Sequence, residues 1–360
     1  MKILIDIGHP AHVHFFKNTI RALKSRGHEI AIVTKDKEVT IDLLKKFGFD
    51  YYNLGKPGKG LSGKAVGLLS FDYQLYKIAQ KVKPDLFVGM ASPYLGHVSR
   101  LIRKPYISFW DTETADLLIF LSYHFVDTIC TPQCFLKPLG DRQVLYEGYK
   151  ELAYLHPHQY TPDPSVLDDL GLSKNERFII VRFISWAASH DVGLRGVSNP
   201  VQMVKELEKY GRVFVSSEKT PDKKLDEYRL NITPEKFHSL LSFAQLYIGE
   251  GGTIATEAAI LGTPAIHIEA DSHGVATGYS SGNFQELRDR YGLMFFYPDE
   301  KTALNKAIEI LDDPHSKSEW QKKREALLND KIDVTAWMID FIERYPDSFL
   351  QYQKMHRASK

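Results

Sequence analysis

Residues 246–264 read Leu-Tyr-Ile-Gly-Glu-Gly-Gly-Thr-Ile-Ala-Thr-Glu-Ala-Ala-Ile-Leu-Gly-Thr-Pro and contain the strongest signal in the sequence. It predicts a buried strand, a glycine turn, and a helix that a final glycine ends before a new strand. Gly251 and Gly252 lack a Cβ, so a phosphate can approach the amides at the helix start. Thr253 is predicted to cap the helix, and Glu257 to accept hydrogen bonds from ribose hydroxyls. The stretch therefore predicts an anion site, although a structural turn with Glu257 in solvent is the alternative.

Strands and helices alternate along the rest of the chain. The first half opens with predicted strands at 3–7 and 29–34 around a helix at 13–26, and further pairs follow up to residue 131. After a proline-rich stretch the pattern restarts with a strand at 178–183. Such alternation favours parallel sheets covered by helices on both faces. We therefore predict two Rossmann-like α/β domains rather than a TIM barrel, which would run on without a central break.

The prolines between residues 156 and 164 are predicted to separate the two domains. The predicted division is a first domain over 1–155, a linker over 156–176, a second domain over 177–330 and a C-terminal segment over 331–360. This last segment contains an amphipathic helix. Packing in the core explains the apolar stripe of that helix. Because two domains are predicted, we expect a ligand to bind in a cleft between them.

The composition excludes several classes of protein. Lys and Arg number 46 and Asp and Glu 45, so the net charge of +1 gives no general attraction for nucleic acid. The N-terminus lacks a signal-peptide pattern, and no apolar run approaches the roughly 20 residues that span a bilayer. We expect a cytoplasmic protein. The lysine-rich loop at 55–64 is interpreted as a solvated loop, with contact to acceptor phosphates or to the inner face of the membrane as the alternative.

Three histidines follow the first predicted strand, at the edge where ligands bind in such sheets. They are His9, His12 and His14, the last of them expected on the following helix. A neutral imidazole takes up a proton near pH 7, so His9 and His12 are the predicted catalytic bases. Helix capping by His9 and packing or surface roles for the others are the alternatives. No carboxylate or cysteine pattern completes a metal site here, and we predict no metal.

Other strand ends supply further candidates. Asp111 and Glu113 follow the strand at 106–110 and are predicted acid–base residues, with helix capping by Asp111 as the alternative. Arg182 would neutralise a pyrophosphate, unless it pairs with a structural carboxylate. The remaining candidates for binding the same phosphate-containing ligand are Ser185, His190, Ser216, Glu250 and His273. Polar turns are the alternative explanation for several of them.

The segment at 246–264 resembles the nucleotide-sugar-binding segment of GT-B proteins, notably the MurG glycosyltransferase and UDP-N-acetylglucosamine 2-epimerase families. These families place a glycine turn, a helix bearing Glu and a Leu-Gly-x-Pro exit against the donor diphosphate and ribose. The resemblance implies that the glycine turn and Thr253 hold phosphate and that Glu257 holds the ribose. The whole chain, including Gly-His-Pro-Ala-His at 8–12, is most similar to an uncharacterised GT-B-like family of bacteria and archaea known only as a domain of unknown function.

The resemblance implies a GT-B arrangement of the two domains with a cleft, and a C-terminal helix that crosses back to the first domain. It also implies a glycosyltransferase that uses a nucleotide-sugar, a UDP-sugar, as donor and a glycan or lipid-linked acceptor, without a metal or other cofactor. A 2-epimerase is the alternative, because Asp111 or Glu113 matches the catalytic glutamate of that family. However, the first loop lacks its Arg-Pro-Glu pattern, and Gly89-Met-Ala-Ser92 replaces its Gly-Asp-Thr. A nucleotide-sugar-binding protein without catalysis is the third alternative.

Overall fold

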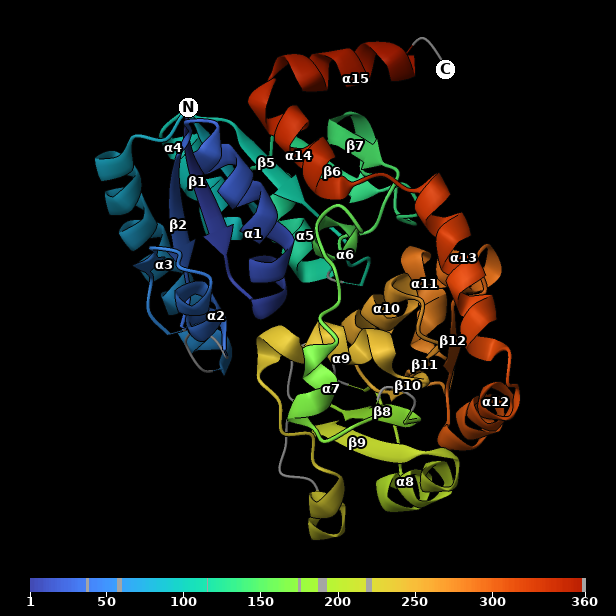
Figure 1. Cartoon of the computed structure of the whole chain (residues 1–360). Helices are drawn as coiled ribbons and strands as arrows, with labels where there is room; N and C mark the ends of the chain where they lie inside the picture. Colours follow the sequence, from blue (N-terminus) through green and yellow to red (C-terminus); the bar gives the residue numbers. More distant parts are fainter. Residues whose placement is uncertain are drawn as a thin grey trace. The chain divides into compact units, whose positions relative to one another are not determined.

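The chain folds into two compact units (Figure 1). Unit 1 comprises Met1–Gln159 and Ile332–Lys360, and unit 2 comprises Tyr160–Lys331. The structure, a computed structural model, describes residues 1–36, 39–56, 60–114, 116–173, 176–186, 193–217 and 222–357, with the backbone alone at 60–66, 116–118 and 357.

In its described residues, unit 1 is built around a seven-stranded parallel sheet with the order β3-β2-β1-β4-β5-β6-β7. Its strands are β1 (Lys2–Ile7), β2 (Glu29–Thr34), β3 (Tyr52–Asn53), β4 (Leu86–Met90), β5 (Tyr106–Phe109), β6 (Thr128–Pro132) and β7 (Gln143–Tyr146). Its helices are α1 (Pro10–Ser25), α2 (Thr40–Lys46), α3 (Gly60–Val82), α4 (Pro93–Leu101), α5 (Asp116–Tyr123), α6 (Leu152–Leu155), α14 (Val334–Glu343) and α15 (Asp347–Arg357), with a 3₁₀ turn at Gly140–Arg142. The strand order reverses between β1 and β4.

The described part of unit 2 contains a five-stranded parallel sheet with the order β12-β11-β10-β8-β9. Its strands are β8 (Phe178–Phe183), β9 (Arg212–Ser217), β10 (Leu246–Gly249), β11 (Ala265–Ile268) and β12 (Met294–Tyr297). Its helices are α7 (Ser165–Asp169), α8 (Pro200–Leu207), α9 (Phe237–Phe243), α10 (Gly252–Leu261), α11 (Gly282–Asp289), α12 (Glu300–Asp312) and α13 (Ser316–Asp330), with 3₁₀ turns at Glu208–Tyr210, Lys223–Tyr228, Pro234–Lys236 and Thr277–Ser280. Here the strand order reverses between β8 and β10.

The unit 1 sheet is buried on both faces, which explains its apolar strands. Leu4 of β1 and Phe87 of β4 belong to a core cluster with residues of α3 and α4. On the other face, Phe15 of α1 meets Phe109 of β5 with ring centroids 5.3 Å apart. Because side chains alternate between the faces and both faces are covered, apolar residues follow one another without a polar alternation. Consecutive apolar residues are therefore the sequence signal of these strands.

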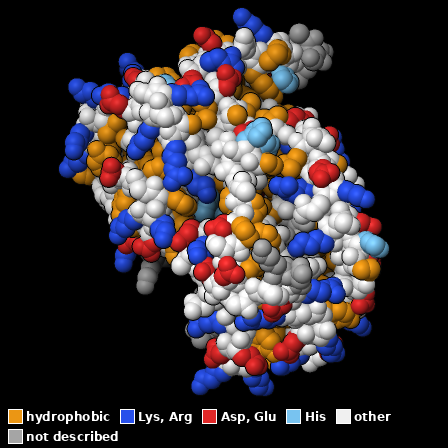
Figure 2. Space-filling model, in the orientation of Figure 1, with side chains coloured by type: hydrophobic (Ala, Val, Ile, Leu, Met, Phe, Trp, Pro, Cys, Tyr) orange, Lys and Arg blue, Asp and Glu red, His pale blue; other side chains and the backbone are white. Residues whose placement is uncertain are grey.

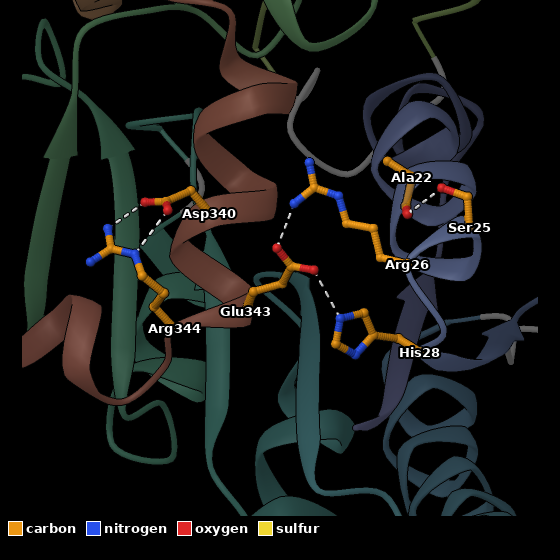
Figure 3. Close-up of polar contacts among 7 residues, drawn as sticks. All are labelled: Ala22, Ser25, Arg26, His28, Asp340, Glu343 and Arg344. Carbon is orange, nitrogen blue, oxygen red and sulfur yellow. Dashed lines mark hydrogen bonds and ion pairs between the residues drawn. The ribbon is translucent and has the colours of Figure 1, made fainter.

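The end of the chain returns to unit 1, where α14 packs against α1 and α6. At the end of α14, Glu343 accepts a hydrogen bond from Arg26 at 2.6 Å and lies 2.9 Å from His28 Nε2 (Figure 3). Arg344, which directly follows this helix, donates from Nε to Asp340 Oδ1 at 2.8 Å (Figure 3). These contacts place the predicted C-terminal helix within unit 1.

The boundary between the units is sharper than the predicted linker. Tyr160 already belongs to unit 2, where its hydroxyl lies 2.7 Å from Ser239 Oγ. Gln159 belongs to unit 1, where its Nε2 donates to Asp333 Oδ2 at 2.8 Å. The division at 159/160 falls inside the expected linker over 156–176, and side-chain hydrogen bonds hold the residue on each side of it to its own unit.

Charges of both signs mix on the surface. Figure 2 shows Lys and Arg side chains interspersed with Asp and Glu over the visible face, in keeping with the net charge of +1. Among the described helices, none combines the length and the apolar content needed to cross a bilayer.

Candidate functional site

The predicted anion site of unit 2 lies where the strand order reverses. β8 and β10 are neighbours there, and Arg182 of β8 stands opposite Gly249 of β10. Open parallel sheets bind ligands at such a reversal, because the loops that leave the two strands turn to opposite faces and leave a crevice. The topology therefore puts the glycine turn and Arg182 at the expected binding edge.

The glycine turn has a backbone that other residues would not fit. Gly249 and Gly251 have φ values of 149° and 91°. A Cβ on Gly249 would lie 2.2 Å from the carbonyl oxygen of Arg182, and one on Gly252 would lie 2.6 Å from an aromatic ring. Gly251 is the N-cap of α10, and no side chain caps this helix. The predicted cap by Thr253 is wrong, because the helix begins one residue earlier and Thr253 lies exposed in its first turn.

Arg182 and Ser216 meet beside this helix start. Nη1 of Arg182 donates to Ser216 Oγ at 2.8 Å, and the two residues are paired in adjacent strands. A Cβ on Gly251 would lie 3.8 Å from Arg182 Cγ, so the arginine stem runs alongside the glycine turn. A guanidinium, a hydroxyl and a helix N-terminus without a side-chain cap all favour a bound anion. The structure thus brings these predicted residues together.

Glu250 holds the loop after β8 to the glycine turn. Its Oε2 accepts from the amide of Ile184 and its Oε1 from the amide of Val197, both at 2.8 Å. Burial raises the pKa of Glu250 in spite of these hydrogen bonds. Because both oxygens are engaged by backbone amides, Glu250 supports the loop. The same loop contains Ser185, which is half-buried, and His190, which lies outside the described residues.

Glu257 is buried on the second turn of α10, with its side chain 7% exposed. Its Oε1 lies 3.0 Å from Nε2 of His238, an equally buried residue of α9. The ring of Tyr160 packs edge-on against His238 at 6.2 Å. A ribose hydroxyl at Glu257 would therefore share the carboxylate with His238, a partner that the sequence analysis did not identify.

His273 lies exposed in a tight turn after β11. Its amide donates to Asp271 Oδ1 at 2.8 Å. A cavity of about 310 Å³ is next to this turn and is lined by Gly274, Tyr279, Arg288, Phe296 and neighbouring residues. His273 thus stands beside a hollow in unit 2 and apart from the hydrogen bonds around Arg182.

In unit 1, His9 caps α1. Its Nδ1 accepts from the amide of Ala11 at 3.2 Å, so the proton of the neutral ring resides on Nε2. His12 lies in the first turn of α1, and the two rings are 5.8 Å apart. His14 is on α1 as predicted, 5.5 Å from the ring of Tyr154. Since a protonated Nε2 donates rather than accepts, the cap favours His12 over His9 as a base.

Asp111 and Glu113 sit at the same edge of the unit 1 sheet. Oδ2 of Asp111 lies 2.5 Å from Lys150 Nζ, which is itself 3.5 Å from Glu151. Glu113 is buried, and its Oε1 accepts from the amide of Leu136 at 3.3 Å. Only β4 separates β1 from β5, so the histidines and these acids leave strands that are roughly 10 Å apart. The ammonium of Lys150 next to Asp111 is a feature that the sequence analysis missed.

A second missed feature is the buried carboxyl group of Asp6 in β1. The Tyr94 hydroxyl donates to its Oδ1 at 2.7 Å and its Oδ2 at 2.6 Å. Nζ of Lys35 lies 5.0 Å from the centre of the Tyr94 ring. Burial raises the pKa of Asp6, against the charge of Lys35 and the hydrogen bonds from Tyr94 and Ser92. An acidic residue inside an apolar strand was the signal that could have identified it.

Replacing Asp6 with asparagine should change how stability depends on pH. A carboxyl whose folded pKa is raised contributes stability that is complete below its ordinary pKa of 3.8 and is lost as the pH rises through the folded pKa. We therefore expect the free energy of unfolding of the wild type to fall, relative to Asp6→Asn, as the pH rises above about 4 toward neutral. Urea denaturation of both proteins over this range measures the difference. A rise in the free energy of unfolding of the wild type relative to Asp6→Asn would mean that the charge of Lys35 outweighs burial.

Known proteins are similar to this chain in sequence or in fold. The Uncharacterized protein MJ0665 of Methanocaldococcus jannaschii is 26% identical over 280 residues, which cover 74% of this chain and 81% of that protein. The UDP-GlcNAc 2-epimerase of Neisseria meningitidis, bound to UDP-GlcNAc, has a TM-score of 0.70 at 12% identity, covering 96% of this chain and 100% of that chain. The glycosyltransferase SsfS6 of Streptomyces sp. SF2575, complexed with thymidine diphosphate, has a TM-score of 0.62 at 14% identity, covering 96% and 99%. The predicted GT-B fold is confirmed.

The family is established over most of the chain. The model of the family described as Protein of unknown function (DUF354) matches residues 1–339. This match confirms the resemblance to an uncharacterised GT-B-like family that the sequence indicated. The chain belongs to the DUF354 family.

Proposed function

We propose that the chain is a glycosyltransferase that uses a UDP-sugar donor and needs no metal ion for the transfer. The observation that carries the proposal is the meeting of Arg182, Ser216 and the N-terminus of α10 at the strand reversal of unit 2. These groups favour a diphosphate, because each offers positive charge or hydrogen-bond donors. UDP-GlcNAc and thymidine diphosphate, bound in the two similar structures, each contain a diphosphate, which supports the same assignment.

The proposed reaction assigns the donor to unit 2 and the acceptor to unit 1. The acceptor oxygen attacks the anomeric carbon, and the bond from that carbon to the diphosphate breaks with its electron pair passing to the diphosphate. The acceptor proton passes to His12. Arg182 and the first amides of α10 stabilise the charge on the leaving diphosphate, and Glu257 binds the ribose. The lysine-rich loop, proposed for a glycan or lipid-linked acceptor, falls partly outside the described residues, at 57–59.

A 2-epimerase is the second candidate, and the acidic group of unit 1 favours it. Removing and returning a proton at C2 of the sugar needs an acid and a base. Buried Glu113, and Asp111 beside Lys150, supply ionisable groups at one sheet edge. The transferase is preferred because the three groups at α10 act on the leaving diphosphate, whereas Asp111 is already paired with an ammonium.

Incubation with a panel of UDP-sugars in D₂O, followed by ¹H and ³¹P NMR, tests the proposal. We expect UDP to be released slowly to water and faster to a hydroxyl acceptor, while the remaining donor keeps its hydrogen at C2. His12→Ala is expected to lower the rate of UDP release by about 100-fold or more, because it removes the general base. His124→Ala, which removes an exposed histidine of unit 1, is the matched control.

Other outcomes contradict the transferase in different ways. Deuterium at C2 without an acceptor would establish the epimerase in its place. Saturable UDP binding without UDP release or exchange would leave a binding protein. No binding of any nucleotide would remove the proposed donor site altogether, and wild-type turnover in His12→Ala would remove the proposed base.

A further inference from the structure

Two histidines and an aspartate meet in unit 1, close to both places where the chain passes between the units. His156 and His158 follow α6, and Asp333 precedes α14. The three residues offer one ligand atom each, all within 4.8 Å of one another. Nδ1 of His158 lies 3.5 Å from Asp333 Oδ2, and Nδ1 of His156 lies 4.0 Å from the same oxygen. In the part of the chain that the structure describes, no other three His, Cys, Asp or Glu residues are grouped in this way.

Neighbouring groups fix the orientation of the aspartate. Oδ1 of Asp333 accepts from the amide of Ala336 and so caps α14, at 3.0 Å. Oδ2 accepts from Gln159 Nε2 at 2.8 Å and faces the two imidazoles. The side chains of His156 and Asp333 are each 10% exposed, whereas that of His158 is 76% exposed. Two ligands are therefore held in place, and the third is free to adjust its position. Hydrogen-bonded carboxylates of this kind are typical of metal ligands.

The chemistry of this group matches a transition-metal ion. Zinc binds imidazole nitrogen at 2.0–2.1 Å and carboxylate oxygen at 2.0–2.2 Å, which puts the ligand atoms of a tetrahedral site roughly 3.4 Å apart. The two distances to Asp333 Oδ2 approach this value. The long contact from the His158 amide to His156 Nδ1, at 3.3 Å, would give way to the metal bond.

We propose that His156, His158 and Asp333 bind a Zn²⁺ ion, with water as the fourth ligand. This site differs from the absence of metal predicted from the sequence, and it shares no residue with the proposed transfer site. The units divide at 159/160 and at 331/332, within a few residues of the ligands on each side. The bound ion therefore links the segment on which the chain leaves unit 1 to the segment on which it returns.

Zinc binding by the full-length, tag-free protein tests the site. After removal of metal with a chelator, competition against a chromogenic zinc indicator is expected to show one tight site per chain. His158→Ala should weaken this site by at least about tenfold, because losing a direct ligand costs no less than losing an outer contact. Asp333→Asn should weaken it similarly while leaving α14 intact, since asparagine caps helices as well as aspartate does. With Co²⁺ in place of Zn²⁺, visible absorption bands of tetrahedral coordination are expected.

The controls separate this site from other histidines and from misfolding. His124→Ala removes an exposed histidine of the same unit and should leave zinc affinity unchanged. Circular dichroism should be the same for all variants. The proposal is overturned if the wild type binds no zinc, or if His158→Ala and Asp333→Asn retain its affinity. In either case the cluster is an aspartate in polar contact with two imidazoles and holds no metal.

Discussion

Replacing Arg182 with alanine is expected to weaken UDP binding by about 10- to 100-fold, because a hydrogen-bonded contact to a charged group contributes roughly 1.5–3 kcal/mol. The guanidinium already lies at the strand reversal, 2.8 Å from Ser216 Oγ, so binding needs little rearrangement. Calorimetric titration with UDP measures the effect. Uridine, which lacks the diphosphate, should bind both proteins equally, because the lost contact is to phosphate.

The matched control is Arg212→Ala. Arg212 begins β9 at the opposite edge of the same sheet, where its side chain is 48% exposed and lies 3.8 Å from Glu176. The substitution removes the same charge from unit 2 but leaves unchanged the sheet edge at the C-terminal ends of the strands, so UDP affinity should remain that of the wild type. An equal loss in both variants would attribute the effect to net charge. No loss in Arg182→Ala would remove the diphosphate from this edge.

Much of the fold followed from local pattern. β8 has the bounds that its run of apolar residues predicted, because a doubly covered parallel strand is apolar throughout. Gly262 ends α10 with φ 81°, the left-handed conformation expected of a terminal glycine. β7 and β12 were absent from the prediction. Both lie at the edge of a sheet, where alternate residues are only half-buried, so neither has the fully buried run of a central strand.

The candidate site was predictable residue by residue but not contact by contact. Arg182 and Ser216 were both identified from strand ends, yet their contact depends on β8 and β9 being neighbours in register. The partners of Glu257 and Asp111, His238 and Lys150, come from elements distant in the sequence. Local pattern carries no information about such pairs. Only the folded structure brings these partners together. His238 and Lys150 then compete with any ligand for the carboxylates of Glu257 and Asp111.

Gly249→Ala is expected to have the largest effect on stability, a loss of more than about 4 kcal/mol that would leave unit 2 largely unfolded. The methyl group would lie 2.2 Å from the carbonyl oxygen and 2.7 Å from the amide nitrogen of Arg182, which are backbone atoms of a central strand. Relief of this clash requires β8 and β10 to separate. Urea denaturation of the purified variant, or its loss from the soluble fraction, measures the effect.

Gly171→Ala is the control that separates the steric clash expected in Gly249→Ala from the energetic cost of placing alanine at a positive φ. Gly171 also has a positive φ, 61°, and lies in unit 2, but a Cβ there meets nothing within 4 Å. Its replacement should cost only about 1–2 kcal/mol, the price of the left-handed conformation. Similar losses in the two variants would mean that strand packing tolerates a methyl group. A far larger loss of stability in Gly249→Ala would instead show that the close approach of β8 and β10 at Gly249 excludes a methyl group. The glycine turn before α10 depends on this close approach.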